Sequence, residues 1–120
     1  MKITRTALEF ILGASRGAHP REFIGMLRAD GDTITETLII PGSKFEECRS
    51  SILAHMVPMD TTIIGSIHSH PGPPRPSRAD LEFFRKMGRF HMIVGYPYSP
   101  RDIAVFNSDG SPASLELSND

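Results

Sequence analysis

The sequence predicts an α/β sandwich in which helices pack on one mostly antiparallel or mixed β-sheet. Segments with helical and strand periodicity follow one another in the order helix, strands, helix, strands. A chain of 120 residues has the length of a single domain, and no linker divides it. Hydrophobic residues make up 39% of the chain and charged residues 22%, which is typical of a globular protein with one core.

The first expected element is a helix. Apolar residues recur at helical spacing over residues 5–17. Thr4 or Thr6 can supply the N-cap, and Pro20 follows the end of the pattern. A helix is therefore predicted over residues 5–17.

Strand patterns follow this helix. The expected strands cover residues 22–29, 33–40, 62–70, 90–97, 103–107 and 113–117. Residues 62–70 give the clearest pattern, because β-branched residues are frequent there. The last two strands flank the turn sequence Ser-Asp-Gly-Ser and predict a terminal hairpin. Residues 50–57 fit either a short strand or a helical turn, and residues 43–49 give no assignment.

A second helix is expected after a proline-rich loop. Four prolines within residues 71–76 exclude a helix in the loop itself. Leu81, Phe84 and Met87 then fall on one helical face, and Gly88 marks the stop.

Composition excludes several classes of function. Thirteen basic and 14 acidic residues give a formal net charge of -1, so no strong attraction to nucleic acid or anionic membranes is expected. No apolar stretch approaches the roughly 20 residues of a membrane span, and the N-terminus does not resemble a signal peptide. Cys48 is the only cysteine, so no intramolecular disulfide forms and the reducing cytoplasm is the expected compartment.

Two histidines on the clearest strand suggest a metal site. Residues i and i+2 of a strand point to the same face, so His68 and His70 project together and Ser69 points away. Two imidazoles in this arrangement can reach one metal ion at about 2.0–2.1 Å each.

A carboxylate would complete such a site. Asp80 is the nearest candidate, because the proline-rich loop leads back to the first turn of the following helix. Three protein ligands leave a fourth tetrahedral position open for water, as in catalytic zinc sites. Hydrolysis also needs a group that moves protons, and Glu22, in the predicted strand 22–29, is a candidate for this role.

Each of these residues also has a purely structural interpretation. Ser77-x-x-Asp80 before an apolar face matches a capping box, although a capping serine can still present its hydroxyl to a site. A His-x-His pair also occurs in cores and on surfaces, and Glu22 alone fits an exposed strand-end charge. The remaining histidines and the cysteine have no partner at ligand spacing; these residues are His19, His55, His91 and Cys48.

The five candidate residues together resemble the motif of the JAMM (MPN+) zinc metalloproteases. Members carry a glutamate on an early strand, then His-x-His-Pro, a loop and Ser-x-x-Asp. The matching residues here are Glu22, His68, His70, Ser77 and Asp80. The resemblance covers nearly the whole chain and is strongest to short stand-alone archaeal-type members. The loop at residues 71–76 is one residue shorter than is usual in the family.

The resemblance implies a fold, a cofactor and a reaction. The fold would be a cytidine-deaminase-like sandwich, with residues 1–120 forming a single catalytic domain. His68, His70 and Asp80 would bind one Zn²⁺. Glu22 would deprotonate water and then protonate the leaving amine, and the Ser77 hydroxyl would donate to the oxyanion. The substrate would be an isopeptide bond between the Gly-Gly tail of a ubiquitin-like modifier and a lysine.

Two other functions fit parts of the pattern. A non-catalytic MPN-type scaffold would only dock partners, but scaffolds of this type lose motif residues that this chain keeps. An iron oxygenase with two histidines and one carboxylate would explain the three ligands but would leave Glu22 and Ser77 without a role. Metal content distinguishes these hypotheses.

Overall fold

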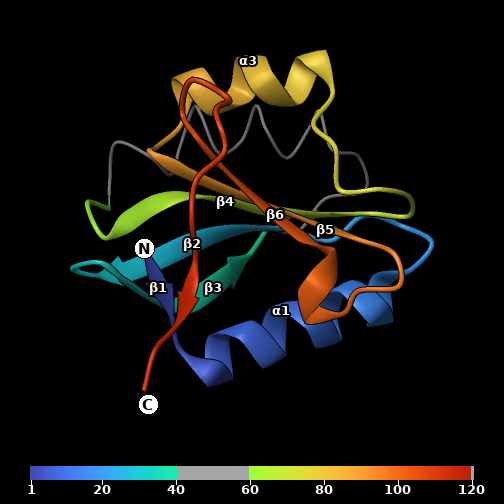
Figure 1. The fold of residues 1–120 in the computed structure, drawn as a ribbon, viewed down its shortest axis with the longest axis horizontal. Coiled ribbons are helices and arrows are strands. Elements are labelled where there is room, and N and C mark those ends of the chain that lie inside the picture. Colours follow the sequence, from blue (N-terminus) through green and yellow to red (C-terminus); the bar gives the residue numbers. More distant parts are fainter. Residues whose placement is uncertain (41–59, 120) are drawn as a thin grey trace.

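The computed structural model describes residues 1–40 and 60–119, which form one mixed sheet with a helix on each face (Figure 1). In chain order the elements are β1 (Lys2–Ile3), α1 (Arg5–Ala18), β2 (Ile24–Asp30), β3 (Thr33–Ile39), β4 (Ile63–His70), α3 (Arg78–Lys86), β5 (Phe90–Gly95), a 3₁₀ helix (Pro100–Asp102), β6 (Ile103–Asn107) and β7 (Glu116–Leu117). The described strands lie in the order β6-β5-β4-β2-β3-β1-β7. The predicted α/β sandwich with a mixed sheet is confirmed, and the expectations for residues 43–49 and 50–57 fall outside the described residues.

Helix α1 covers one face of the sheet, as predicted. Its N-cap is Thr4, whose Oγ1 accepts a hydrogen bond of 3.1 Å from the backbone N–H of Ala7. Its inward face buries Ala7, Ile11, Leu12 and Ser15. The apolar residues of this face join sheet residues such as Ile34 and Ile67 in one buried cluster. Burial of this cluster from water holds the helix on the sheet.

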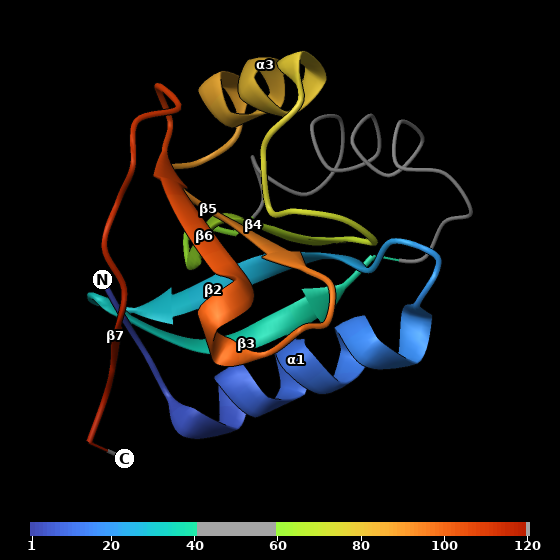
Figure 2. The same ribbon diagram turned by 45° about the vertical axis from the view of Figure 1, so that its right-hand side comes forward.

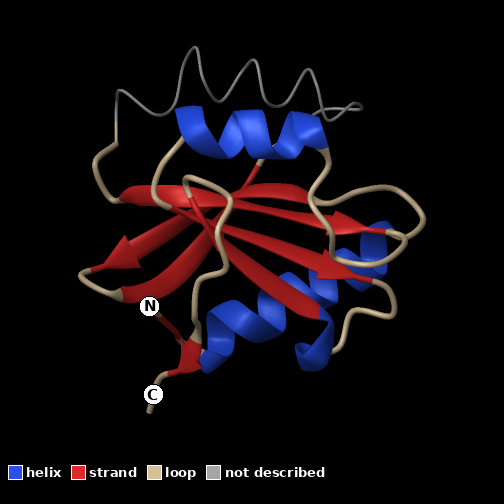
Figure 3. Ribbon diagram, turned by 45° about the horizontal axis from the view of Figure 1, so that its top comes forward, coloured by secondary structure: helices blue, strands red, loops and turns tan. Residues whose placement is uncertain are grey.

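Helix α3 covers the opposite face (Figures 1 and 3). Its buried residues include Phe83 and Phe84, which pack in a second cluster with Met26 and Ile93 of the sheet. The helix ends before Gly88, whose φ of +71° favours glycine. The two helices thus shield both faces of the central strands, which explains why β4 and β5 are almost entirely buried.

Strand β4 is central and determines the geometry of the site. It pairs antiparallel with β2, where Ile24 lies opposite His68, and parallel with β5, where Gly95 lies opposite His70. A parallel pair needs a crossover connection, and α3 with its flanking loops provides it. The chain therefore leaves the end of β4 at His70 and passes at once into the proline-rich loop and α3.

The predicted terminal hairpin is only partly correct. After β6, Phe106 forms a β-bridge with Pro112, and the Ala113 N–H donates to the Val105 carbonyl. Beyond them the chain crosses to the other end of the sheet, where β7 pairs in parallel with β1 (Figure 2). The two-residue β1 was not predicted. It is too short to show periodicity, and β7 depends on it for pairing.

The remaining boundaries differ slightly from those expected. Strand β5 stops at Gly95 rather than at residue 97, because the chain bends away at Tyr96 and Pro97. Strand β2 begins at Ile24, so Glu22 precedes it instead of starting it. Among the described residues, no helix has both the length and the apolar character required to span a membrane.

Candidate metal centre

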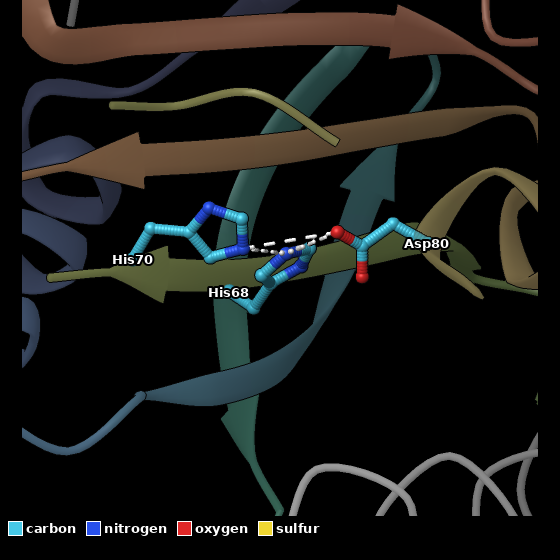
Figure 4. A group of neighbouring side chains, drawn as sticks. All are labelled: His68, His70 and Asp80. Atoms are coloured by element: carbon cyan, nitrogen blue, oxygen red, sulfur yellow. Dashed lines mark hydrogen bonds and ion pairs between the residues drawn. The ribbon is translucent and has the colours of Figure 1, made fainter. Parts of the chain in front are cut away.

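Three side chains converge between the end of β4 and the start of α3 (Figure 4). His68 Nε2 and His70 Nε2 lie 3.1 Å apart. The Asp80 Oδ2 atom lies 3.5 Å from His68 Nε2 and 3.7 Å from His70 Nε2. These three residues form the only group of at least three histidine, cysteine or acidic side chains with metal-binding spacing in the described part of the chain.

The strand and the helix each place part of this group. Alternation along β4 sends both histidines toward the face that α3 covers. Asp80 occupies the first turn of α3 and is buried, at 3% exposure. The loop of residues 71–76 therefore brings the carboxylate to the histidines, although it is only six residues long.

The predicted capping box fixes Asp80. Asp80 Oδ2 accepts a hydrogen bond of 2.8 Å from the Ser77 N–H, and the Asp80 N–H donates to Ser77 Oγ at 3.1 Å. Burial alone would raise the pKa of Asp80, but hydrogen bonding and charge from His68 and the bonds from Ser77 outweigh it. The pKa falls to about 2, so the carboxylate is ionised at neutral pH.

The loop also orients His70. Its Nδ1 atom lies 3.3 Å from the carbonyl oxygen of Pro73, to which the protonated nitrogen donates. A proton on Nδ1 leaves the lone pair on Nε2, the atom that faces Asp80 and His68. The Tyr96 N–H donates to both the His70 carbonyl (3.1 Å) and the Gly72 carbonyl (3.2 Å), which holds the loop against the end of β5.

The ligand atoms of His68, His70 and Asp80 suit a cation with tetrahedral coordination. Bonds of about 2.0–2.1 Å in a tetrahedral zinc site place ligand atoms about 3.3–3.4 Å apart, near the separations of this group. Two imidazole lone pairs cannot face each other at 3.1 Å unless a proton or a metal ion is shared between them. Two imidazoles and one carboxylate are also a ligand set of catalytic zinc sites. The three residues therefore fit a metal ion such as zinc.

Glu22 lies beside this group without joining it. Its Oε1 atom is 3.9 Å from His70 Nε2, and its side chain is 35% exposed. The side chain comes from the connection between α1 and β2, two residues before the strand begins. The structure therefore brings a partly solvated carboxylate next to the cluster, although its sequence position is nearly fifty residues away.

The other histidines have separate environments. His19 Nδ1 bonds the Tyr98 hydroxyl at 2.7 Å, and His91 Nδ1 lies 2.7 Å from the Ser66 hydroxyl. The ring of His91 stacks on Phe84, with centroids 4.3 Å apart, and burial lowers its pKa to about 4. His55 and Cys48 lie outside the described residues.

Tyr98 is a buried residue that the sequence analysis did not single out. This tyrosine is 2% exposed and has a φ of +66°. Burial raises its pKa, with further contributions from nearby Tyr96 and Glu22. The expected strand stopped at residue 97, so the sequence pattern gave Tyr98 no role.

Comparisons with known proteins agree with this geometry. A family model described as prokaryotic homologues of the JAB domain matches residues 5–108. A probable metalloprotease of Haloferax volcanii is 40% identical over 126 aligned positions, which cover 96% of this chain and 78% of the relative.

Two solved structures are similar over almost the full chain. A JAB1/MPN domain protein from Archaeoglobus fulgidus has a TM-score of 0.80 and 35% identity, covering 99% of this chain and 100% of the other. A structure described as a JAMM metalloprotease-like zinc site in the proteasome and signalosome has a TM-score of 0.77 and 35% identity, covering 99% and 98%. The chain therefore belongs to the JAMM, or JAB1/MPN, metalloprotease family, among its prokaryotic members.

Proposed function

We propose that this protein is a zinc-dependent isopeptidase. It would hydrolyse the bond between the C-terminal Gly-Gly of a ubiquitin-like modifier and a lysine. The observation that carries the proposal is the position of Glu22, whose carboxylate lies 3.9 Å from His70 Nε2 but outside the His68, His70 and Asp80 group. A carboxylate beside a metal site, and not bound to it, can move protons to and from the reacting groups.

Each motif residue has a role in this proposal. His68, His70 and Asp80 would hold the zinc ion. A zinc ion held there would act as a Lewis acid and lower the pKa of a coordinated water to about 7. Glu22 accepts the proton of the attacking water and delivers it to the lysine nitrogen as the C–N bond breaks. Its partial exposure keeps it within reach of both water and substrate.

Ser77 would stabilise the developing negative charge. Its Oγ accepts the Asp80 N–H, which leaves the hydroxyl proton available as a donor. Ser77 is exposed at the start of α3, next to the ligand Asp80, so a substrate can approach it. A donor aimed at a developing oxyanion is typically worth about 3–4 kcal/mol of transition-state stabilisation.

The substrate class rests on the family relationship and on elementary chemistry. A diglycine tail has no side chains, so it fits a narrow approach and can lie extended along a strand edge. We propose that conjugates of a small ubiquitin-like modifier are the partners and that residues 1–120 act as one catalytic domain. A cytoplasmic location is part of this proposal and follows from the single cysteine.

The alternative function is a scaffold that docks partners without catalysis. A scaffold does not require a metal ion or a proton-transferring carboxylate, whereas this chain has both the ligand group and Glu22. Metal content separates the two functions. The protein purified without chelator should contain about one zinc per chain if it is an enzyme of this type.

A cleavage assay tests the proposal. The substrates are a modifier joined through its C-terminal Gly-Gly to a lysine Nε, and the same sequence joined through a linear peptide bond. We expect cleavage of the isopeptide, loss of cleavage with chelator and recovery on adding Zn²⁺. A zinc-loaded wild-type protein that cleaves neither substrate would contradict the proposed activity and favour the scaffold.

A further inference from the structure

We propose that Ser69, the residue between the two histidines, is a positioning residue for Glu22. This inference rests on the proposed function, because it assigns Ser69 a task in the reaction that Glu22 serves. Ser69 points to the face of the sheet opposite to the metal ligands and is fully buried. Its effect on the site must therefore pass through the backbone of the neighbouring chain segment.

Ser69 holds that segment by two hydrogen bonds. The Ser69 N–H donates to the Phe23 carbonyl at 2.9 Å, and the Phe23 N–H donates to the Ser69 hydroxyl at 2.8 Å. In a regular antiparallel pair the second bond would go to the main-chain carbonyl of the partner residue. Here a side-chain oxygen accepts it at the point where β2 begins. The hydroxyl of Ser69 thus fixes where the chain joins the sheet.

Glu22 is the residue immediately before this attachment. The segment is also held by the side chain of Phe23, which is 7% exposed and packs edge-on against Phe10 at 6.4 Å between centroids. By contrast, the Glu22 side chain is 35% exposed, and its one ion-pair contact within the described residues is the 3.9 Å approach to His70. The position of its carboxylate therefore depends on the backbone at Phe23.

The same segment of β4 thus provides two of the metal ligands and fixes the position of Glu22. His68 and His70 present their imidazoles on one face, while Ser69 ties Phe23 from the other. A shift of about 1 Å in a reacting group can lower a rate about 100-fold. Loss of the Ser69 hydroxyl leaves the Phe23 N–H without this acceptor and frees Glu22 to move. His70 and Asp80 keep their own hydrogen bonds to Pro73 and Ser77.

Kinetics of Ser69→Ala test the inference. We expect kcat on the isopeptide substrate to fall about 10- to 100-fold, with KM and zinc content within about twofold of wild type. Ser69→Thr keeps the hydroxyl and should restore most of the activity. Ser66→Ala is the matched control, because it removes another buried hydroxyl of β4 that bonds His91 rather than Phe23. Ser66→Ala should leave kcat within about twofold.

A double variant separates positioning of Glu22 from general damage. If Ser69 acts through Glu22, Ser69→Ala should have almost no further effect in the Glu22→Gln protein. An equal loss of activity in both backgrounds, or full kcat in zinc-loaded Ser69→Ala, would overturn the inference.

Crystal structures of zinc-loaded wild-type and Ser69→Ala proteins supply a readout that does not need activity. We expect the Glu22 carboxylate to move by more than about 1 Å in the variant, a displacement of the size that matters for catalysis. An unchanged Glu22 position would overturn the inference. If the wild-type protein cleaves no conjugate, the proposed function fails, and these structures still decide whether Ser69 fixes Glu22.

Discussion

The Nε2 atoms of His68 and His70 lie 3.1 Å apart, with Asp80 Oδ2 within 3.7 Å of both. Neutral imidazoles approach this closely when they share a proton or a cation. Metal binding replaces the proton and adds the attraction of the ionised carboxylate. The cluster therefore fits a bound cation such as zinc.

Removal of one imidazole should abolish zinc binding. His70→Ala leaves two ligands, and we expect zinc content to fall from about one per chain to near zero. Zinc at about 100 times its dissociation constant should stabilise the wild-type fold by about 2.7 kcal/mol, and the variant should lose this gain. Elemental analysis and thermal unfolding with and without Zn²⁺ measure both effects. His19→Ala, a histidine outside the cluster, should bind zinc like wild type.

A methyl group at Gly95 should weaken the metal site from a distance. A Cβ there would lie 2.7 Å from the Gly72 carbonyl oxygen and 2.8 Å from Pro74 Cδ, so the loop must shift. That loop orients His70 through Pro73, and loss of such a support typically costs about 10- to 100-fold in metal affinity. Zinc titration of Gly95→Ala measures the loss. Unchanged affinity would show that the loop does not support His70.

Gly17→Ala is the control for this substitution. Nothing lies within 4 Å of a Cβ at Gly17, which sits in the last turn of α1. Helix propensity predicts that it raises stability by roughly 0.5–1 kcal/mol. Its zinc affinity should equal that of wild type.

Substitutions at Ser77 should separate its capping role from its proposed catalytic role. Ser77→Ala removes the cap of α3 and should lower the free energy of unfolding by about 1 kcal/mol. Ser77→Gly also lacks the hydroxyl but places a tolerated residue at the N-cap, so it should be destabilised by only a few tenths of a kcal/mol. Both variants should lose about 10²- to 10³-fold in kcat if the hydroxyl stabilises the oxyanion. Wild-type turnover in Ser77→Gly would remove Ser77 from the mechanism.

Stability should fall in mild acid because His91 is buried without charge. Burial holds its pKa at about 4 in the folded protein, against an ordinary value of 6.5. Between these pH values the unfolded chain binds a proton that the folded chain does not. The free energy of unfolding should therefore decrease by up to about 3 kcal/mol as pH falls from 6.5 to 4.

The contribution of His91 can be isolated in metal-free protein. In the presence of chelator, protons no longer compete with zinc for the metal ligands, so this source of pH dependence is absent. The glutamine of His91→Gln has no titratable group. Chemical unfolding of both proteins across this pH range gives the difference at each pH. As pH falls from 6.5 to 4, the free energy of unfolding of the wild-type protein should decrease steadily relative to that of His91→Gln. A constant difference would show that His91 does not contribute to the pH dependence.

Much of the site could be predicted because its signals are local. The two-residue period of a strand puts His68 and His70 on one face, and the capping box at Ser77 marks where α3 begins. The prolines limit the loop to a short return that brings Asp80 back. These inferences need only periodicity and turn chemistry, which is why the structure agrees with them.

The remaining features depend on contacts that are distant in sequence. Glu22 reaches His70 only because β2 pairs with β4, and neither segment alone determines the register of that pair. Likewise, β7 pairs with the two-residue β1 rather than with its neighbour β6. Ser69 shows the limit most clearly, because alternation predicts that it points away from the metal but not that it holds Phe23.

The most direct test of the proposed mechanism is the comparison of wild-type and Glu22→Gln proteins loaded with equal zinc. The substitution keeps the size of the side chain and removes its ability to take a proton. We expect zinc content and thermal stability close to those of wild type, with kcat on the diglycine–lysine isopeptide reduced at least about 100-fold, the lower range for general acid–base catalysis. Full turnover by zinc-loaded Glu22→Gln protein would contradict the role of the Glu22 carboxylate in proton transfer.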